Sequence, residues 1–317
     1  MHAVFLDQQT FSDKVSFSPI KTQVGKFTSY PLTTESQRVE HCQNADIVIT
    51  NKVVIDENVL NQLPNLKLIC IAATGTNNID LVAAKKRGIA VTNVSGYSTP
   101  SVTQYVFSQI LSYYSRIDSH NDNVKQGKWQ QHHSFCYHGN GSNEIAGKTM
   151  TIFGYGTLGK GIAKVAKAFD MKVLIAERPN ASVIREGRVS FESAIKQADI
   201  LTLHCPENEQ TLGLINAQIF DQMKPTAMLI NTARGGIVNS LDLLSALKNK
   251  QIAYAAIDVL EQEPPSATHP LLNQSLTNIS ITAHVAWASF EAQQRLLNLI
   301  AINIADFQTG KMTNRLV

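Results

Sequence analysis

The chain lacks most of the features that mark secreted or membrane proteins. Its four cysteines, Cys42, Cys70, Cys136 and Cys205, form no C-x-x-C pair, which argues against a disulfide framework or a zinc site and favours reduced thiols in the cytoplasm. No apolar run approaches the roughly 20 residues that span a bilayer. The first residues carry no basic leader, so we expect no signal peptide.

An excess of one charge sign is also lacking. Lys and Arg total 28 against 25 Asp and Glu, which leaves a formal charge of +3. This balance gives no electrostatic reason to expect a nucleic-acid or membrane partner. Hydrophobic residues make up 44% of the 317 residues, enough for a sizeable core, and the length favours two domains.

Short apolar runs alternate with helix-period segments, as in parallel sheets covered by helices on both faces. Early strands are expected at residues 3–6, 47–49, 68–73 and 89–91, with helices near 36–42, 56–63 and 79–87. A helix at 100–119 and a polar loop at 121–147 come next. Six further strands, the number in a doubly wound dinucleotide fold, are expected at 149–153, 172–176, 200–203, 228–230, 254–257 and 279–282.

A last helix at 290–307 begins where this second sheet is complete. We expect it to pack back on the first domain, which makes that domain discontinuous. The predicted domains are therefore residues 1–98 plus 287–317, and residues 99–286.

A glycine-rich loop follows the first strand of the second domain. Gly154-Tyr155-Gly156-Thr157-Leu158-Gly159 matches G-x-G-x-x-G and opens a helix whose expected apolar face is Leu158, Ile162, Val165, Ala166 and Phe169. In this pattern the first glycine permits a tight turn, the second lets the backbone approach a pyrophosphate, and the third allows close helix–strand packing. The order of strand, loop and helix predicts a dinucleotide cofactor at the helix N-terminus.

An acidic residue after the next strand bears on the type of cofactor. Glu177 lies 23 residues after Gly154, where a carboxylate accepts a hydrogen bond from a ribose 2′-hydroxyl and repels a 2′-phosphate. We therefore expect NAD rather than NADP. Arg178 could accommodate the phosphate and keeps NADP open, and a glycine-rich turn with a solvated Glu177 is the alternative without a cofactor.

Polar side chains follow the later strands of the second domain, at the carboxyl edge where ligands of open α/β sheets bind. In chain order they are His204, Cys205, Pro206, Arg234, Asp258, Glu263 and His284. One basic, one acidic and one imidazole side chain are thus expected beside the cofactor. This set suits reversible hydride transfer at a carbon that bears oxygen.

Three of these residues receive chemical roles. His284 titrates near neutrality and can donate and accept the proton. Glu263 would orient His284 and favour its protonated form, and Arg234 offers a planar fork for a substrate carboxylate. Structural roles remain open for each, as a cap, a solvated loop acid and a turn brace respectively.

Small residues follow the third strand of the first domain. Thr74, Gly75 and Thr76 could expose backbone N–H groups to a substrate carboxylate, although a plain β–α turn would look the same. A polar loop holds the histidines His132, His133 and His138 without a nearby carboxylate, so we expect surface histidines and no metal.

With these residues assembled, the chain resembles the D-isomer-specific 2-hydroxyacid dehydrogenases, and within them the glycerate dehydrogenase (hydroxypyruvate reductase) group. The resemblance covers nearly the whole chain. Its most specific stretches are the glycine loop, Ala72-Ala73-Thr74-Gly75-Thr76-Asn77-Asn78-Ile79-Asp80, Gly96-Tyr97-Ser98-Thr99, Asn231-Thr232-Ala233-Arg234-Gly235-Gly236, Glu263-Pro264-Pro265 and Thr282-Ala283-His284-Val285-Ala286-Trp287-Ala288.

The resemblance implies two doubly wound parallel-sheet domains, a Rossmann coenzyme domain and a smaller flavodoxin-like substrate domain, and a homodimer formed largely through the coenzyme domain. It implies Arg234, Glu263 and His284 as the catalytic set. The substrate would lie against Thr74, Gly75, Thr76, Arg234 and His284. The implied cofactor contacts are Gly154, Gly156, Thr157, Leu158, Gly159, Glu177, His204, Cys205, Pro206, Thr232, Ala233, Arg234, Asp258 and His284.

Two positions depart from the family pattern, since Ala283 stands where proline is common and Tyr105 where histidine is common. The expected activity is reduction of hydroxypyruvate or glyoxylate to D-glycerate or glycolate. Alternatives are a D-lactate-type enzyme that uses pyruvate and a non-catalytic, dinucleotide-sensing corepressor on the same fold.

Overall fold

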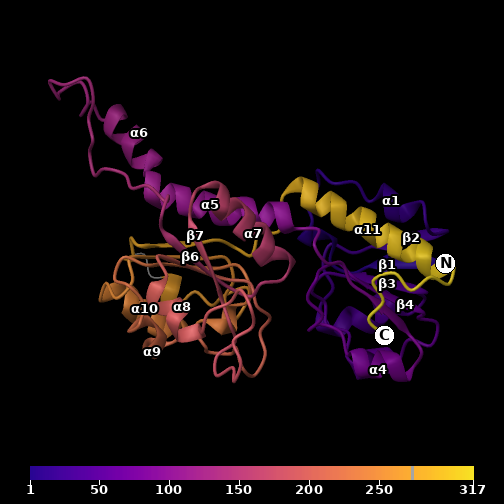
Figure 1. Cartoon of the computed structure of the whole chain (residues 1–317). Coiled ribbons are helices and arrows are strands. Elements are labelled where there is room, and N and C mark those ends of the chain that lie inside the picture. The colour runs from indigo at the N-terminus through magenta and orange to yellow at the C-terminus, as the bar shows by residue number, and fades with distance from the viewer. Residues whose placement is uncertain (273–274) are drawn as a thin grey trace. The chain divides into compact units, whose positions relative to one another are not determined.

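The computed structural model describes residues 1–272 and 275–317, and the chain divides into two compact units. Unit 1 comprises Met1–Ser98 and Trp287–Val317, and unit 2 comprises Thr99–Ala286. Each unit is built on one parallel sheet with packed helices (Figure 1), which confirms the predicted α/β class. None of the described helices is long and apolar enough to cross a membrane.

Unit 1 has a five-stranded sheet in the order β2-β1-β3-β4-β5. This is the flavodoxin-like order, in which the chain reverses direction across the sheet between β1 and β3. The strands are β1 (His2–Phe5), β2 (Lys26–Ser29), β3 (Ile47–Thr50), β4 (Leu68–Ile71) and β5 (Ala90–Thr92). Its helices are α1 (Ser18–Lys21), α2 (Arg38–Cys42), α3 (Glu57–Asn61), α4 (Leu81–Lys86) and α11 (Phe290–Gln308).

The core of unit 1 lies on both faces of this sheet. All residues of β3 and β4 are buried, as expected for central strands covered by helices on both sides. On one face, α11 buries Leu296, Leu297 and Ile300 among the aromatic side chains around Phe5. Strand β2 was not predicted from the sequence, because it is a half-exposed edge strand, Lys-Phe-Thr-Ser, without an apolar run.

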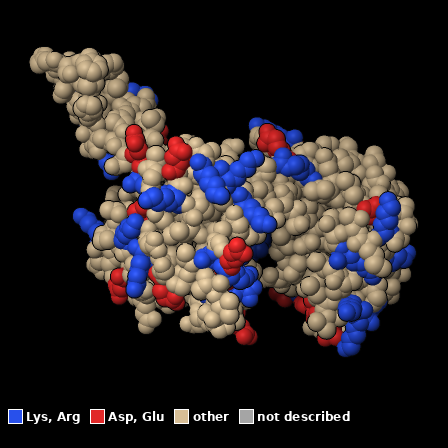
Figure 2. Space-filling view, viewed as in Figure 1, with Lys and Arg blue, Asp and Glu red and all other residues tan. Residues whose placement is uncertain are grey.

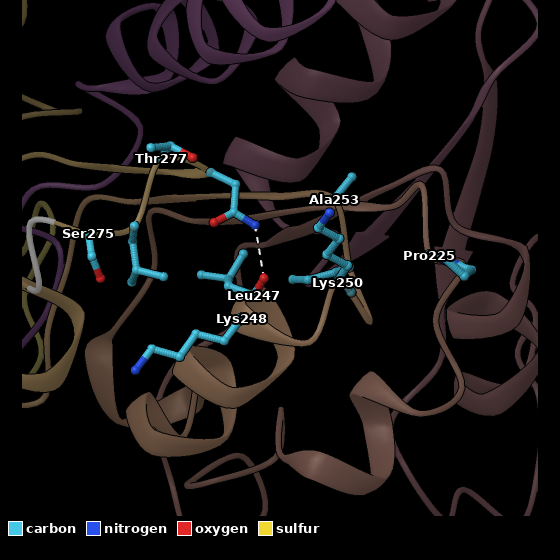
Figure 3. Close-up of a pocket in the computed structure, with 10 residues that line it drawn as sticks. Pro225, Leu247, Lys248, Lys250, Ala253, Ser275 and Thr277 are labelled. Atoms are coloured by element: carbon cyan, nitrogen blue, oxygen red, sulfur yellow. Dashed lines mark hydrogen bonds between the residues drawn. The ribbon is translucent and has the colours of Figure 1, made fainter.

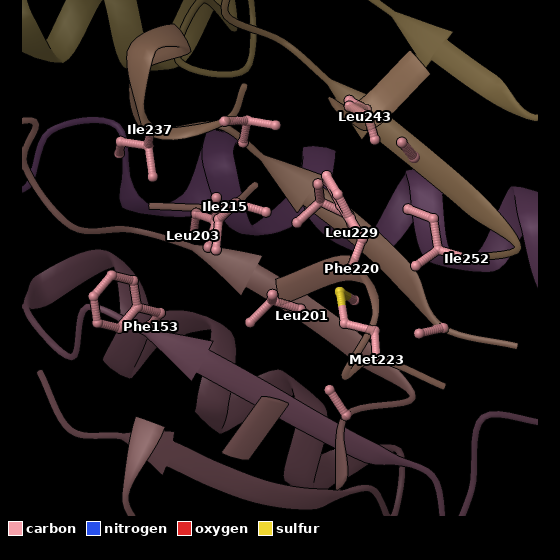
Figure 4. Close-up of a cluster of buried hydrophobic side chains, with 14 of the residues drawn as sticks. Phe153, Leu201, Leu203, Ile215, Phe220, Met223, Leu229, Ile237, Leu243 and Ile252 are labelled. Carbon is pink, nitrogen blue, oxygen red and sulfur yellow. The ribbon is translucent and has the colours of Figure 1, made fainter. Parts of the chain in front are cut away.

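Unit 2 has a six-stranded parallel sheet in the order β11-β10-β9-β8-β6-β7. The strands are β6 (Thr149–Phe153), β7 (Lys172–Ala176), β8 (Ile200–Leu203), β9 (Met228–Asn231), β10 (Tyr254–Ile257) and β11 (Ile279–Ile281). They agree with the predicted strands to within one residue. Helices α7 (Thr157–Ala168), α8 (Phe191–Gln197), α9 (Ala217–Phe220) and α10 (Ser240–Lys248) connect them. Side chains such as Phe153, Leu229 and Leu243 form the core shown in Figure 4.

A single residue takes the place of a further edge strand beside β7. Val189 pairs with Ala176 as an isolated parallel bridge, and its N–H donates to Ile175 O at 3.0 Å. If Val189 is counted as a reduced third strand, the sheet has the dinucleotide-fold order 3-2-1-4-5-6 with one strand added at the far edge. Residues 178–188, which we call the arginine segment, therefore replace a regular crossover at the carboxyl end of β7.

The long helix of unit 2 is broken where the sequence predicted continuity. Helix α5 (Thr99–Ser115) ends at Arg116, whose φ of 51° is left-handed, and α6 (Ile117–Lys125) follows. The predicted helix 100–119 is therefore two helices, and the predicted loop 121–147 begins inside α6. In Figure 1, α6 and residues 126–147 extend away from the sheet of unit 2.

Helix α7 presents a slightly different face to the core from the predicted one. Ile162, Ala163 and Ala166 are buried, whereas Phe169 is 38% exposed and stacks on Phe107 of α5 at 5.6 Å. The opposite face is basic, and Figure 2 shows Lys and Arg side chains gathered over the part of unit 2 where α7 lies. The small residues at positions 159 and 163 bring the helix close to the strand below it.

Candidate active site

The glycine loop forms the first wall of the site, and each glycine has a distinct steric reason. Gly154 has a φ of 100°, and a Cβ there would collide with the backbone of His204 and Cys205 at the end of β8. A Cβ on Gly159 would collide with Gly154 O. Gly156 differs, because a Cβ added there would meet only open space. Gly156 is the N-cap of α7 and offers no side chain to the free N–H groups of the helix. The first N–H groups of α7 thus face a cradle that fits a dinucleotide pyrophosphate.

A cavity of about 400 Å³ opens beside this loop. It lies at the carboxyl ends of β6, β7 and β8, where the strand order reverses, and we call it the switch-point cavity. Open α/β sheets bind ligands at this point. It is lined by Phe153, Gly154, Tyr155, Gly156, Ala176, Arg178, Pro179, Arg185, Arg188, His204, Cys205, Pro206, Asn208, Gln210 and Thr211.

Two predicted cofactor residues that line the cavity are uncharged, and of these Cys205 is buried and His204 is partly buried. Burial lowers the pKa of His204 to about 3, and its Nε2 lies 2.8 Å from Thr202 Oγ1. Burial raises the pKa of the Cys205 thiol to about 12, so it remains protonated at neutral pH. His204 Nδ1 and Thr232 Oγ1 are buried without a hydrogen-bond partner among the described residues. Such orphaned polar atoms at the carboxyl edge are available to a bound cofactor.

Glu177 does not line the cavity. Its side chain is 2% exposed, and its carboxylate accepts hydrogen bonds from Arg178 N at 2.8 Å and Arg185 Nε at 2.6 Å. The hydrogen bond from Arg185 holds the pKa of Glu177 at about 2, although burial opposes this. The expected contact with a ribose hydroxyl therefore remains a prediction, made for a carboxylate that already has protein partners.

The structure pairs two of the three expected catalytic residues. His284 Nδ1 lies 2.7 Å from Glu263 Oε2, although the two are 21 residues apart in the chain. The Glu263 loop is fixed in turn, because Oε1 of Glu263 accepts the Leu260 N–H at 3.0 Å. Both side chains remain partly accessible, at 23% for His284 and 37% for Glu263. This geometry orients the imidazole and leaves Nε2 for a ligand.

A buried carboxylate holds the turn that presents His284. His284 has a φ of 54°, a left-handed conformation that costs about 1 kcal/mol for a residue with a Cβ. Asp258, 1% exposed, accepts hydrogen bonds from Thr282 Oγ1 at 2.6 Å, Val285 N at 2.9 Å and Ala286 N at 2.9 Å. Its carbonyl also accepts the His284 N–H. Asp258, expected near the nicotinamide, therefore stabilises the His284 turn through both carboxylate oxygens.

Tyr105 adds a further support to this turn. Its hydroxyl lies 2.6 Å from Thr282 Oγ1, which in turn donates to Asp258. The departure from the family pattern at this position thus reaches the His284 turn from helix α5. Sequence reasoning identified the position but not the contact, since residues 105 and 282 are distant in the chain.

Arg234 follows β9, one strand away from the Glu263 loop. Asn231 Nδ2 donates to Arg234 O at 2.8 Å and shapes the turn. Gly235 is required, because a Cβ there would collide with the backbone of Leu260 and Glu261. The Arg234 turn and the loop that carries Glu263 are therefore packed backbone to backbone. The guanidinium of Arg234 is partly exposed, with Nη1 donating to Ala233 O at 2.6 Å.

The predicted carboxylate-binding residues lie in unit 1, directly after β4. Thr74 Oγ1 donates to Val94 O at 2.8 Å, and Asn93 Nδ2 donates to Thr74 O at 2.7 Å. Gly75 and Thr76 are partly exposed at the carboxyl edge of that sheet. Their meeting with Arg234 and His284 in one site remains a prediction.

Comparison with known proteins assigns the family. The family model for the NAD binding domain of D-isomer specific 2-hydroxyacid dehydrogenases matches residues 107–286. A glycerate dehydrogenase of Methylorubrum extorquens is 39% identical over 311 residues, 98% of this chain and 97% of that protein. This chain belongs to the D-isomer-specific 2-hydroxyacid dehydrogenase family. The family resemblance seen in the sequence is thereby confirmed.

Two further comparisons extend the likeness. A hydroxypyruvate reductase of Blautia hydrogenotrophica is 33% identical over 286 residues, 89% of this chain and 88% of that protein. A solved acyclic imino acid reductase, in complex with NADPH and D-Arg, is 26% identical with a TM-score of 0.85 and covers both chains completely. This chain thus shares its fold with a solved reductase at low sequence identity.

A second cavity lies at the opposite edge of the unit 2 sheet. It has a volume of about 500 Å³ and is lined by residues that precede β9, β10 and β11, such as Pro225, Ala253 and Thr277 (Figure 3). This is the amino edge of the strands, away from His284 and the glycine loop, all of which follow strands. The switch-point cavity is therefore the candidate for the cofactor.

Sequence reasoning missed two residues of the candidate site, Arg185 and Arg188. Both line the switch-point cavity, and both lie in the arginine segment. The sequence did contain a signal for these residues, since three arginines occur in the eleven residues that follow a predicted strand and the acidic Glu177. Only the folded segment shows that they face the cavity.

Proposed function

We propose that this protein catalyses the reversible reduction of a small 2-oxo acid, hydroxypyruvate or glyoxylate, to the D-2-hydroxy acid, D-glycerate or glycolate. The observation that carries the proposal is the 2.7 Å contact between His284 Nδ1 and Glu263 Oε2, on the same edge of the sheet as the glycine loop. Relatives named glycerate dehydrogenase, hydroxypyruvate reductase and glyoxylate reductase support the substrate class.

His284 is the proposed proton donor and acceptor. A bound nicotinamide dinucleotide would supply the hydride that reduces the carbonyl carbon. Because Nδ1 of His284 is occupied by Glu263, Nε2 is the atom that delivers a proton to the carbonyl oxygen, and takes it back in the reverse direction. Glu263 orients the ring through this contact.

Arg234 is the proposed clamp for the substrate carboxylate, through the planar donor fork of its guanidinium. Thr74, Gly75 and Thr76 would complete this carboxylate site from unit 1. In this proposal unit 2 is the coenzyme domain, and unit 1 supplies substrate contacts. The glycine loop and the N-terminus of α7 would hold the pyrophosphate.

A homodimer formed through unit 2 completes the proposal. Helix α6 and residues 126–147 expose large apolar side chains, with Ile117 at 66%, Trp129 at 45% and Phe135 at 90% exposure. A second copy would remove these side chains from water. Light scattering after gel filtration tests this, and a monomer at micromolar concentration would contradict it.

One assay separates the candidate activities. Purified protein is mixed with NADH or NADPH and with hydroxypyruvate, glyoxylate or pyruvate, while the absorbance of the reduced cofactor is followed. We expect the fastest oxidation with hydroxypyruvate or glyoxylate. Preference for pyruvate would indicate a D-lactate-type enzyme, and cofactor binding without oxidation for any of the three acids would favour the dinucleotide sensor.

A further inference from the structure

The arginine segment, residues 178–188, has a defined shape. Its ends are held together at β7, because Glu177 N donates to Val189 O at 2.9 Å and Val189 pairs with Ala176. Within the segment, left-handed turns occur at Asn180, with a φ of 57°, and at Gly187, with a φ of 73°. The segment therefore forms a closed loop at the rim of the switch-point cavity.

Three arginines of this loop lie at the rim. Arg178, Arg185 and Arg188 all line the cavity, and Arg178 and Arg185 are exposed. The described residues that line the cavity include no aspartate or glutamate. An anion that enters this end of the cavity therefore meets basic side chains without an acidic one on the wall.

Glu177, at the end of β7, does not line the cavity, and its carboxylate is bound by protein groups. Besides the bonds from Arg178 N and Arg185 Nε, Glu177 forms an ion pair with Arg185 Nη2 and another with Arg188 Nε at 3.7 Å. A ribose 2′-hydroxyl would have to displace these donors to reach it. Across residues 177–188, three arginines stand against Glu177 and Glu186, which leaves a net charge of about +1.

The arginines keep donors for a ligand. A guanidinium carries five N–H donors, and Arg185 directs only Nε and Nη2 toward Glu177. Arginine pairs with phosphate through parallel hydrogen bonds, which makes it well suited to a terminal phosphate group. The rim is thus built for a phosphate monoester rather than for a neutral hydroxyl.

We propose that this cavity binds a dinucleotide that carries a 2′-phosphate on its adenosine ribose, held by Arg178, Arg185 and Arg188, so that the cofactor is NADP(H). This revises the expectation of NAD that Glu177 raised from the sequence. The inference rests on the proposed function only in that the glycine loop binds a nicotinamide dinucleotide.

Fragments without the nicotinamide test the proposal apart from catalysis. The full-length protein is titrated by calorimetry with 2′,5′-ADP, with 5′-ADP and with inorganic phosphate. We expect 2′,5′-ADP to bind at least about tenfold more tightly than 5′-ADP, since one charge-assisted contact is worth that much. The preference should shrink as salt is added. Inorganic phosphate alone should bind much more weakly than either nucleotide.

Two arginine variants locate the effect. Arg178→Ala and Arg188→Ala should each reduce the preference for 2′,5′-ADP over 5′-ADP by about tenfold while 5′-ADP affinity changes little. Arg178 is the safer variant, since its side chain is exposed. Arg87→Ala, an exposed arginine of unit 1, is the matched control and should leave the preference unchanged.

Three results would overturn the inference. Equal affinity for the two nucleotides, or tighter binding of 5′-ADP, would mean a site for NAD and would leave the proposed function standing. Phosphate that binds as tightly as 2′,5′-ADP would mean a general anion site. If neither nucleotide nor either reduced dinucleotide binds, both this inference and the proposed function fail.

Discussion

The two sheets reverse their strand order in the same way, yet the two reversal points differ. In unit 1, a side chain of the protein occupies the reversal point between β1 and β3. Asp7, two residues after β1 and 2% exposed, accepts the N–H groups of Asn51 at 2.9 Å, Lys52 at 2.7 Å and Val53 at 3.2 Å. In unit 2, between β6 and β8, Gly154 follows β6 directly, and the switch-point cavity opens beside it.

The comparison shows how one topology serves two purposes. A carboxylate of the protein satisfies the N–H groups at one reversal point, so the fold there needs no ligand. A glycine at the other leaves room and unsatisfied donors, so a ligand with negative charge can take that place. Candidate chemistry therefore concentrates on unit 2, whose carboxyl edge also carries the His284–Glu263 pair.

Removal of the imidazole gives the largest expected effect. His284→Ala should reduce turnover by about 10²- to 10⁴-fold, because the proton then lacks a positioned donor. Dinucleotide affinity, measured by fluorescence titration, should change far less than turnover. His133→Ala, at an exposed position in residues 126–147, is the control. Turnover within threefold of the unmodified protein would remove His284 from its proposed role.

Removal of the Asp7 carboxylate tests the reversal point of unit 1, between β1 and β3. Asp7→Ala leaves several buried N–H groups without an acceptor and should destabilise unit 1 by about 3 kcal/mol. Calorimetric melting should show this loss, while 2′,5′-ADP binding to the folded protein stays unchanged. Asp13→Ala, which removes an exposed carboxylate, should melt like the unmodified protein. An unchanged melting profile for Asp7→Ala would contradict the contrast drawn between the two sheets.

His204, a partly buried residue of the switch-point cavity, predicts a pH dependence of stability. Burial lowers the pKa of His204 to about 3, so the folded protein keeps it neutral while the unfolded chain takes up a proton below about pH 6.5. Stability from this group is therefore lost as the pH falls below 6.5, by about 2 kcal/mol at pH 5.

His204→Asn should flatten the decline of the melting temperature between pH 6.5 and pH 5. His132→Asn, at an exposed position in residues 126–147, serves as the control. Identical slopes for the His204 variant and the unmodified protein would show that His204 is protonated in the fold.

The contact between Glu263 and His284 predicts a loss of catalytic rate when the carboxylate is removed. In Glu263→Gln the imidazole loses the carboxylate oxygen that lies 2.7 Å from Nδ1, so kcat for reduction should fall by about tenfold while dinucleotide affinity changes little. Steady-state kinetics measure this, with Glu192→Gln on α8 as the control. An unchanged kcat would show that Glu263 does not position His284.

The smallest effect is expected at the remote support of the His284 turn. Tyr105→Phe removes one hydrogen bond to Thr282, worth about 1 kcal/mol, so kcat should fall a few-fold while the KM for the 2-oxo acid changes little. Tyr113→Phe on the same helix is the control. A rise in KM with kcat preserved would place Tyr105 in substrate binding instead.

Much of the framework could be predicted because it depends on local patterns. Apolar runs bounded by polar turns identified the strands of unit 2, and the glycine spacing identified the loop between β6 and α7. The edge strand β2 was not predicted, because it is partly exposed and has no apolar run. The break at Arg116 was not predicted either, because a single left-handed residue changes the hydrophobic periodicity very little.

The sequence by itself determined which residues stand at the carboxyl ends of strands, because strand ends follow from short-range hydrophobic patterning and turn chemistry. Only the tertiary structure decided how their side chains pair. Glu177 turns to Arg185 rather than to the cavity, and Asp258 holds the turn of His284. Such choices depend on the path of irregular loops, where atoms distant along the chain compete for the same carboxylate oxygens.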